Sequence, residues 1–402
     1  MEKFTVIITH YNQMKYIKEA ILSVLKQKYK NIEIIIADDC SKEFDKKAVK
    51  KMIDENNKNN FEYKIIQGRK NVGTVKNLNN ALKKVSGDYI LFFASDDKLA
   101  NNSVISNFVN EFKDKSKNIV TSQCGLYGNK LNKKLADYID VKSALKLNKK
   151  SSTEIYEKMC EGCFYGSGGT AYRKLVFEKY GNFNEDYKYV EDWSYWLYVL
   201  RSGEKIYYAN FDTLCHRDGG ISHSTYTKDT IPPHVKQYYK DILCIYKNEV
   251  IPYLNKFSTK EKYRILRQYN ETILYYSCFV PSLASNIKIF DNARLDDKKL
   301  KYYWKFQTIK RIAKQIIKID LLRKIKIQII YNRVVPITVL IWILCCLFII
   351  NNLNIKNNHL LLLTYIFVYV ALYCIIYIID KTFYYFSLIV KNKKLRGKNN
   401  AI

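Results

Sequence analysis

The segment Tyr89–Asp97 reads YILFFASDD and places two adjacent carboxylates, Asp96 and Asp97, directly after a run of apolar and aromatic residues. A short apolar run that follows a glycine, here Gly87, predicts a buried strand. Ligands of open α/β sheets bind beyond the carboxyl ends of the strands, where this acidic pair would lie. Carboxylates there suit Mg²⁺ or Mn²⁺, although Ser-Asp-Asp is also common in solvated turns.

Strand-like and helix-like segments alternate before and around this pair. Strands are expected at 4–9, 32–37, 61–67 and 89–94, with helices at 17–26 and 74–84. This spacing is typical of βαβ units and predicts an α/β fold with a mainly parallel, Rossmann-like sheet wrapped by helices. Three of the strands end in polar sequences, THYN, ADDCS and SDD, which would meet at one edge of the sheet.

The charge of the 402-residue chain is concentrated near its C-terminal end. A formal net charge of +29 suggests nucleic acid or an anionic membrane as partner. Basic residues gather between Lys298 and Arg333, directly before two apolar runs at 334–350 and 360–379. This placement favours lipid headgroups and indicates no nucleic-acid partner. Each run is near the length of a membrane-spanning helix, and a buried helical hairpin in a soluble core is the alternative.

Four parts follow from this pattern: a sheet domain at 1–227, a basic helical region at 228–333, a hairpin of two transmembrane helices within 334–380, and a basic tail at 381–402. Basic residues lie on the outer sides of the two apolar runs, which predicts that both termini are in the cytoplasm. No signal-peptide pattern precedes the first strand. An apolar stripe opposite basic residues around 309–319 suits either the membrane interface or packing on the main domain. Scattered cysteines indicate free thiols.

The ordered set of motifs resembles family 2 glycosyltransferases with the GT-A fold, over residues 3–223. The motifs are Thr9–Asn12, Asp38–Ser41, Asn71–Gly73, Gly87–Tyr89, Ser95–Asp97, Gly166–Tyr172, Gly181–Phe183 and Glu191–Trp193. The resemblance implies an inverting enzyme of the bacterial cell-surface polysaccharide type, which transfers a hexosyl or N-acetylhexosaminyl group from a nucleotide-sugar.

In that family, the second carboxylate of the acidic pair holds a divalent cation and the first contacts the ribose. The resemblance therefore implies Asp97 as a ligand of Mn²⁺ or Mg²⁺ and Asp96 as a donor contact. Many relatives carry a further aspartate where this chain has Ala94. His216 and Arg217 resemble a segment that closes over the diphosphate, His216 as a metal ligand and Arg217 as positive charge; a structural histidine is the alternative.

The resemblance assigns the nucleotide to four further residues. Asp39 matches a residue that recognises uracil, and Thr9 and Tyr11 match contacts to the base, so a UDP-sugar is the expected donor. Lys76 stands where relatives often carry arginine. A lysine there would meet a phosphate as a point charge, or else lie on a solvated helix face.

The acceptor side is implied by the motif Glu191-Asp192-Trp193 and by the glycine-rich segment at 166–170. Asp192 matches the base that takes the proton of the acceptor hydroxyl. Glu191, Trp193 and Gly168 would contact the acceptor. The alternatives are an N-cap acid opening a helix at 193–201, and a plain glycine turn.

The leading prediction is a membrane-associated enzyme that transfers one sugar to a hydroxyl of a polyprenyl-diphosphate-linked glycan. A polyprenyl-phosphate glycosyltransferase is a close alternative, whose phosphate acceptor would need no general base. A catalytically weak membrane scaffold that keeps the fold is the alternative from another class, and Ala94 is the departure that motivates it.

Overall fold

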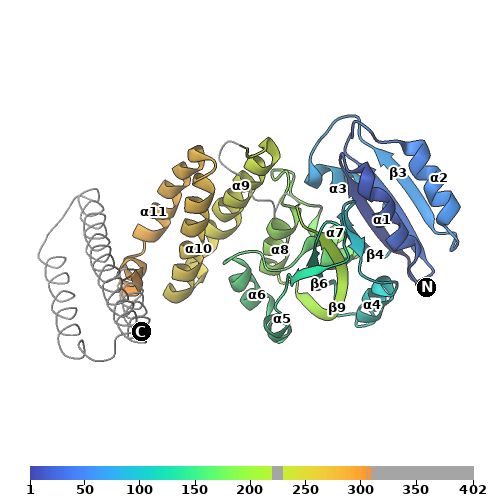
Figure 1. Cartoon of the computed structure of the whole chain (residues 1–402). Helices are drawn as coiled ribbons and strands as arrows, with labels where there is room; N and C mark the ends of the chain where they lie inside the picture. The colour runs from blue at the N-terminus through green and yellow to red at the C-terminus, as the bar shows by residue number, and fades with distance from the viewer. Residues whose placement is uncertain (220–229, 305, 309–402) are drawn as a thin grey trace, which may run out of the picture. The chain divides into compact units, whose positions relative to one another are not determined.

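The computed structural model describes residues 1–219, 230–304 and 306–308, all within one compact unit, Met1–Lys310 (Figure 1). No helix among these residues has the length and apolar character needed to cross a membrane. The predicted transmembrane segments, the basic tail and the stripe at 309–319 lie outside the described residues.

A single nine-stranded sheet organises the unit, in the order β3-β2-β1-β4-β8-β6-β9-β5, with β7 paired to β6. Strands β1 to β4 pair in parallel, as predicted. Beyond β4 the sheet is mixed, because β8 runs antiparallel to both β4 and β6 whereas β9 runs parallel to β6. The prediction of a mainly parallel sheet is therefore correct only for the first half of the fold. The strands are β1 Phe4–His10, β2 Ile32–Asp38, β3 Glu62–Gln67, β4 Tyr89–Ala94, β5 Lys98–Leu99, β6 Ile119–Tyr127, β7 Lys134–Asp137, β8 Thr170–Arg173 and β9 Ile206–Arg217.

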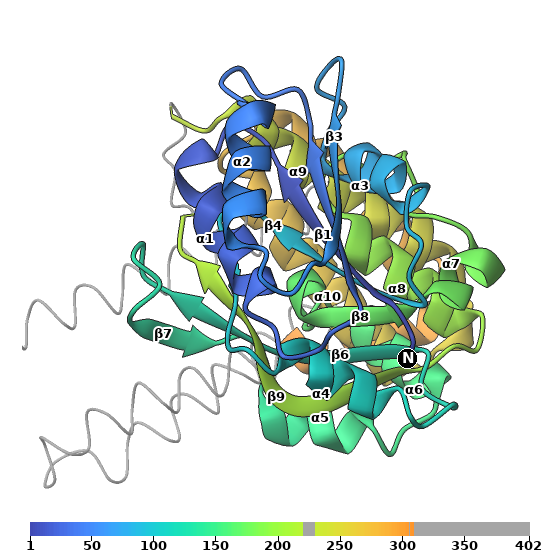
Figure 2. The same ribbon diagram turned by 90° about the vertical axis from the view of Figure 1, so that its right-hand side faces the viewer.

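Helices cover both faces of the sheet, which explains why its central strands are apolar without alternation. Along β1, Ile7 faces one core cluster, whereas Val6 and Ile8 face the other. Helices α1 and α2 lie side by side over the second cluster, and α3 and α8 pack in the first (Figures 1 and 2). The helices of the sheet domain are α1 Met14–Leu25, α2 Lys46–Asn56, α3 Thr74–Leu82, α4 Val104–Glu111, α5 Val141–Leu147, α6 Ser152–Met159, α7 Lys174–Tyr180 and α8 Glu191–Arg201.

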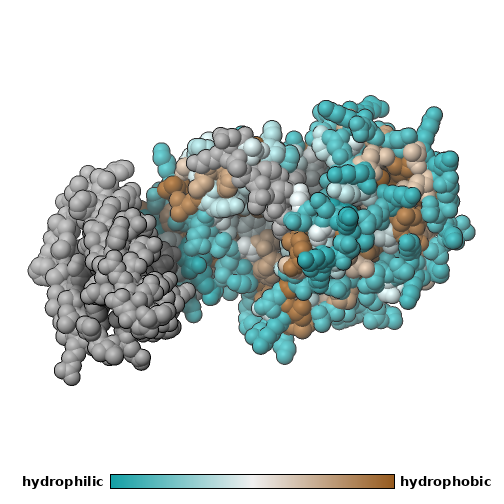
Figure 3. All heavy atoms as spheres, viewed as in Figure 1, coloured by the Kyte–Doolittle hydropathy of each residue, from teal (hydrophilic) through white to brown (hydrophobic). Residues whose placement is uncertain are grey.

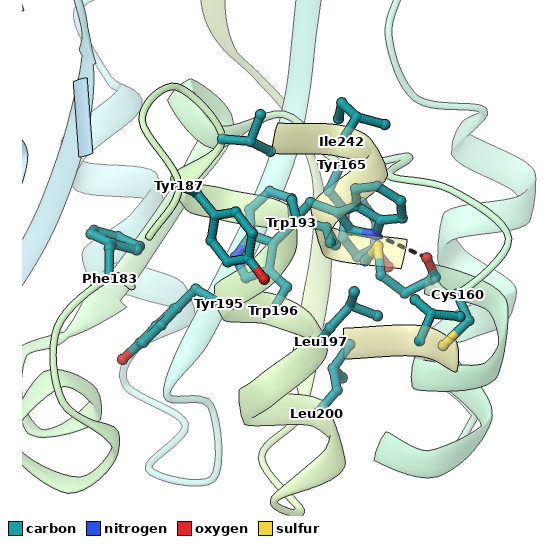
Figure 4. Packing of buried hydrophobic residues seen from close by; sticks show 14 of the residues in the cluster. Cys160, Tyr165, Phe183, Tyr187, Trp193, Tyr195, Trp196, Leu197, Leu200 and Ile242 are labelled. Atoms are coloured by element: carbon teal, nitrogen blue, oxygen red, sulfur yellow. Dashed lines mark hydrogen bonds between the residues drawn. The ribbon is translucent and has the colours of Figure 1, made fainter. Parts of the chain in front are cut away.

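The helical region shares its core with the sheet domain. Tyr246, which follows α9, packs edge-on against Trp193 of α8 with ring centroids 5.0 Å apart, and Ile242 of α9 lies in the same cluster (Figure 4). Arg201 at the end of α8 forms an ion pair of 2.8 Å with Glu249. The described helices of this region are α9 Pro233–Ile245, α10 Thr259–Ser277 and α11 Ile287–Leu295. On the face shown in Figure 3, the described surface is mostly hydrophilic, with apolar residues scattered among the polar ones.

A buried carboxylate stabilises the amino-terminal ends of the parallel strands. Glu33 is fully buried in β2 and accepts hydrogen bonds from Thr5 Oγ1 at 2.7 Å and from Ser86 N at 2.9 Å. Lys64 Nζ lies 2.5 Å from its other oxygen. Burial alone would raise the pKa of Glu33, but these bonds lower it below its ordinary value. Losing one of these donors would leave a buried charge uncompensated, so the bonds fix the edge of the sheet opposite the predicted site.

Candidate functional site

The carboxyl ends of β1, β2 and β4 lie at one edge of the sheet, as predicted. Strand register places Thr9 beside Ala37 on one side and beside Ala94 on the other. The residues that follow these strands, including Asp39 and Asp96, are therefore neighbours at this edge. The sequence prediction that these strand ends share one edge of the sheet is confirmed for the described strands.

Asp97 is held by residues from the end of β9. Its Oδ2 lies 2.8 Å from His216 Nδ1, and its Oδ1 accepts a hydrogen bond of 2.9 Å from the backbone N–H of Arg217. The antiparallel pairing of Lys98 with Cys215 brings these segments together. Burial alone would lower the pKa of His216, but the carboxylate of Asp97 raises it above its ordinary value. The two residues predicted as metal ligands are thus in direct contact.

The donor set around Asp97 fits part of a cation's coordination sphere. A carboxylate and an imidazole stand side by side, and Asp96 adds a second carboxylate that accepts a bond of 3.2 Å from Gln13 Nε2. Ala94, exposed at the strand end, supplies no oxygen. Among the described residues, no group of three or more histidine, cysteine or acidic side chains could hold a metal ion. A cation here would take its remaining ligands from water and the diphosphate.

Arg217 forms a hydrogen bond to the backbone of the acidic pair. Its Nε donates to the carbonyl oxygen of Asp96 at 2.7 Å, and its Nη2 lies 2.7 Å from Glu19. Its guanidinium stacks on the Tyr16 ring at 4.0 Å, and the residue is only 4% exposed. Because the guanidinium is buried among these partners, few of its N–H groups can reach a donor phosphate, which is the contact predicted from the sequence. Glu19 and Gln13 were not predicted from the sequence, because an acid on an amphipathic helix and an amide at its N-cap carry no signal for contacts with Arg217 and Asp96.

The carboxylate of Asp39 organises the turn that precedes α3. It accepts hydrogen bonds from Val72 N at 2.8 Å, Gly73 N at 2.8 Å and Asn71 Nδ2 at 2.9 Å. Burial raises the pKa of Asp39, although the two amide bonds oppose this. Gly73 has a φ of 89°, a conformation that favours glycine, and a Cβ there would lie 2.5 Å from Cγ of Lys188. A carboxylate with about four acceptor positions retains about one for a ligand.

The other predicted donor residues differ in their exposure to solvent. Tyr11 is 48% exposed just beyond the end of β1. Thr9 is partly buried in β1, and its hydroxyl lies 3.5 Å from the Phe93 carbonyl oxygen. Lys76 is about half exposed on α3 and pairs with Glu185 at 3.2 Å. Its placement matches the solvated helix face that the sequence left as an alternative.

Glu191 and Asp192 occupy the first turn of α8. The N-cap position belongs to Val190, so the interpretation of Asp192 as an N-cap acid is wrong. Acidic side chains in a first turn interact favourably with the helix dipole. Burial raises the pKa of both carboxyls, and the charge of Asp192 raises that of Glu191 further. A partly buried carboxylate with a raised pKa suits a general base that works near neutral pH.

Two residues predicted to touch the acceptor lie in the core instead. Trp193 is 2% exposed, and its indole N–H donates to the Met159 carbonyl at 2.9 Å (Figure 4). Gly168 is buried where a Cβ would lie 2.6 Å from Leu214 Cδ2 and 3.4 Å from Phe93 Cβ. The glycine allows the 167–169 turn to pack closely against β4 and β9. A glycine is needed here for this packing rather than to expose the backbone to a sugar.

One residue that the motifs did not assign to the site lies near enough to Asp192 to be affected by its charge. Burial raises the pKa of Tyr238, and the charges of Tyr276 and Asp192 add to the rise. Tyr238 belongs to α9, outside the motif-bearing part of the sequence. Cys163 is exposed whereas Cys160 is buried, and both are free thiols. The sequence prediction of two small buried residues holds only for Cys160.

Residues 5–181 match the profile described as "Glycosyl transferase family 2". These residues therefore form a glycosyl transferase family 2 domain. An uncharacterized glycosyltransferase of Haemophilus influenzae is 27% identical over 65% of this chain and 80% of its own length. The Campylobacter jejuni GalNAc(5)-diNAcBac-PP-undecaprenol beta-1,3-glucosyltransferase is 31% identical over 26% of this chain and 33% of its own.

Solved structures show a weaker likeness. Staphylococcus aureus TarS 1–349, in complex with UDP-GlcNAc, is 16% identical with a TM-score of 0.45, over 77% of this chain and 92% of that one. The family profile ends at residue 181, before the Glu191-Asp192 pair and before His216. The assignment of the second half of the site therefore depends on the geometry described above.

Proposed function

We propose that this family 2 glycosyltransferase transfers one sugar from a UDP-sugar to an acceptor hydroxyl, with inversion at the anomeric carbon. The observation that carries the proposal is the contact of Asp97 with His216 at the carboxyl edge of the sheet. It joins the acidic pair after β4 to the end of β9, where a nucleotide diphosphate would lie.

The donor half of the site would bind the nucleotide through this chain's own side chains. Tyr11 offers an exposed ring on which the base can stack, and stacking contacts of this kind contribute about 1–3 kcal/mol per base. The remaining acceptor position of Asp39 would receive an N–H of uracil. Asp96 would contact the ribose, and Asp97 with His216 would hold Mn²⁺ or Mg²⁺. When bound, such a cation neutralises charge on the departing diphosphate.

The acceptor half would activate the attacking hydroxyl. Asp192 accepts the proton as the acceptor oxygen bonds to the anomeric carbon, while the bond from that carbon to the diphosphate breaks on the opposite face. Burial keeps the pKa of Asp192 above its ordinary value, which strengthens it as a base. Glu191 and the neighbouring Tyr238 would contact the acceptor.

We further propose an acceptor that is a polyprenyl-diphosphate-linked glycan on the cytoplasmic face of a membrane. The basic residues around 298–333 and the apolar runs at 334–350 and 360–379 support this. The name of the Campylobacter jejuni relative contains an undecaprenol-linked acceptor of this chemistry.

A donor-hydrolysis screen tests the proposal. The full-length protein is incubated with UDP-, GDP- and dTDP-sugars and with Mn²⁺ or Mg²⁺, and released nucleotide is measured. We expect hydrolysis of a UDP-sugar that depends on the cation and is lost in Asp97→Ala. Asp137→Ala, an exposed acid on β7 paired with Lys134, is the matched control and should behave as wild type. Equal hydrolysis by Asp97→Ala and wild type would refute the metal-binding role. If UDP binding, measured separately, does not depend on the metal, the catalytically weak scaffold would be favoured.

A further inference from the structure

Asp241 on α9 accepts two backbone hydrogen bonds from the segment that precedes Asp192. The N–H groups of Lys188 and Tyr189 donate to its Oδ2 at 2.8 and 2.7 Å. Its Oδ1 accepts from Gln237 Nε2 at 2.8 Å, and the residue is 2% exposed. A buried carboxylate needs hydrogen-bond donors, because a buried charge without them has a higher free energy than the same charge in water. The contact joins the helical region to the sheet domain.

Residues 187–190, here called the bridge segment, also contact the start of α3. The carbonyl oxygen of Lys188 accepts from Val75 N at 3.2 Å. The Lys188 side chain covers Gly73, where a Cβ would lie 2.5 Å from its Cγ. At its start, Tyr187 is buried, with its hydroxyl 3.4 Å from Glu249. The bridge segment is therefore fixed on one side by helices beyond residue 232 and on the other by α3.

Both proposed halves of the site meet this segment. The turn at Asn71–Gly73, which the bridge segment covers, is the turn that the carboxylate of Asp39 holds. At the other end, the bridge segment continues without a break into Glu191 and Asp192. A displacement of the bridge segment would therefore alter the donor turn and the base together.

We propose that Asp241 is a positioning residue, which fixes the bridge segment and thereby the placement of the donor turn relative to Asp192. The inference rests on the proposed function for the roles of Asp39 and Asp192. The contacts themselves do not depend on it. Asp241 lies on α9, outside residues 5–181 that match the family profile. On this proposal, α9 would complete the active site from beyond the matched residues.

Two substitutions at residue 241 separate positioning from folding. Asp241→Ala removes both acceptors of the backbone N–H groups. Asp241→Asn keeps one side-chain oxygen that can accept from Lys188 and Tyr189, and Gln237 can turn its own oxygen toward the new amide. Asp291→Ala, which removes a partly exposed acid paired with Arg294 on α11, is the control for an alanine substitution in the same region.

Hydrogen exchange of the full-length protein tests the contact without reference to activity. Peptides that cover residues 187–190 and 71–76 should exchange at least about tenfold faster in Asp241→Ala, because a lost buried hydrogen bond lowers the local opening free energy. Peptides from α4 and β6 should be unchanged, and Asp241→Asn and Asp291→Ala should resemble wild type. Unchanged exchange at 187–190 in Asp241→Ala would overturn the proposal.

Kinetics and UDP binding then test the consequence. We expect Asp241→Ala to lower kcat/KM by about tenfold or more and to weaken UDP binding, with recovery in Asp241→Asn. A merely destabilised enzyme would instead lose kcat in proportion to unfolded protein and keep its KM and UDP affinity, and that result would overturn the proposal. If wild type transfers no sugar, the proposed function fails, whereas the exchange and UDP-binding results still decide the role of Asp241.

Discussion

His216 Nδ1 and Asp97 Oδ2 lie 2.8 Å apart although 119 positions separate them in the chain. The pair joins the end of β9 to the turn after β4. We expect His216→Ala to weaken Mn²⁺-dependent UDP binding by about 10- to 100-fold, the range typical when a residue that orients or shares a metal ligand is lost. Isothermal titration with and without Mn²⁺ measures this. His234→Ala, an exposed histidine on α9, is the control, and equal loss in both variants would contradict the role of His216.

Asp192→Asn should remove transfer while leaving donor binding in place. Loss of a general base typically slows a reaction by about 10²–10⁴-fold, because the acceptor hydroxyl keeps its proton. Transfer rate and UDP affinity are measured in parallel, with Asp186→Asn, an exposed acid before α8, as the matched control. Activity near wild type would point to an acceptor that needs no base, such as a polyprenyl phosphate.

The Glu191–Asp192 pair should make stability depend on pH. Burial raises the pKa of both carboxyls above their unfolded values. Such groups favour the folded state fully below the unfolded pKa, and this contribution is lost as the pH rises through the folded pKa. Asp192→Asn should therefore be more stable than wild type at about pH 8, by a margin that shrinks toward about pH 4. Urea unfolding across this range measures the margin, and a margin independent of pH would contradict the prediction.

Arg217→Ala should destabilise the fold as well as the site. Removing a guanidinium that is buried between Glu19 and the Asp96 carbonyl should lower the free energy of unfolding by about 2 kcal/mol, below the range for a fully buried pair because Glu19 is 39% exposed. Lys98→Ala removes the other, more exposed partner of Glu19 and should cost under about 1 kcal/mol. Urea unfolding compares them. Equal costs would mean that Arg217 has no special part in supporting the acidic pair.

Trp193→Phe should lower stability without changing the KM for the acceptor. The substitution leaves the Met159 carbonyl without its buried donor, which costs about 1–3 kcal/mol. Trp304→Phe, in a partly buried tryptophan of the helical region, is the control. Unfolding and steady-state kinetics are measured together. A raised KM for the acceptor at unchanged stability would instead mean that Trp193 contacts the acceptor.

The first half of the fold followed from the sequence because its signals are local. Apolar runs bounded by polar turns located β1, β2 and β4 to within one residue at each end, and β4 spans Tyr89–Ala94 as predicted. The mixed half of the sheet was missed. Strand β8 is short and follows a glycine-rich stretch, and β6 lies in a segment with weak periodicity, so their pairing depends on contacts far apart in the chain.

The site divides in the same way. The sequence placed Asp39, Asp96 and Asp97 at one edge, because residues that follow parallel strands share that edge. It could not show that the guanidinium of Arg217 is buried among protein partners, since a charged side chain gives no sign of whether its partners are substrate or protein. Likewise, a motif tryptophan such as Trp193 looks the same in sequence whether its indole faces a sugar or a backbone carbonyl.

Glu33 and Asp97 occupy opposite ends of the same group of parallel strands, and this separation has a consequence for libraries of single substitutions. Changes at Glu33, fixed by Thr5 and Lys64, should reduce the amount of folded protein in the cell. Changes at Asp97 should stop turnover even in the protein that remains folded. Paired screens of abundance and activity would therefore sort the residues of this sheet by the strand end at which they lie, and would outline the substrate site without a bound ligand.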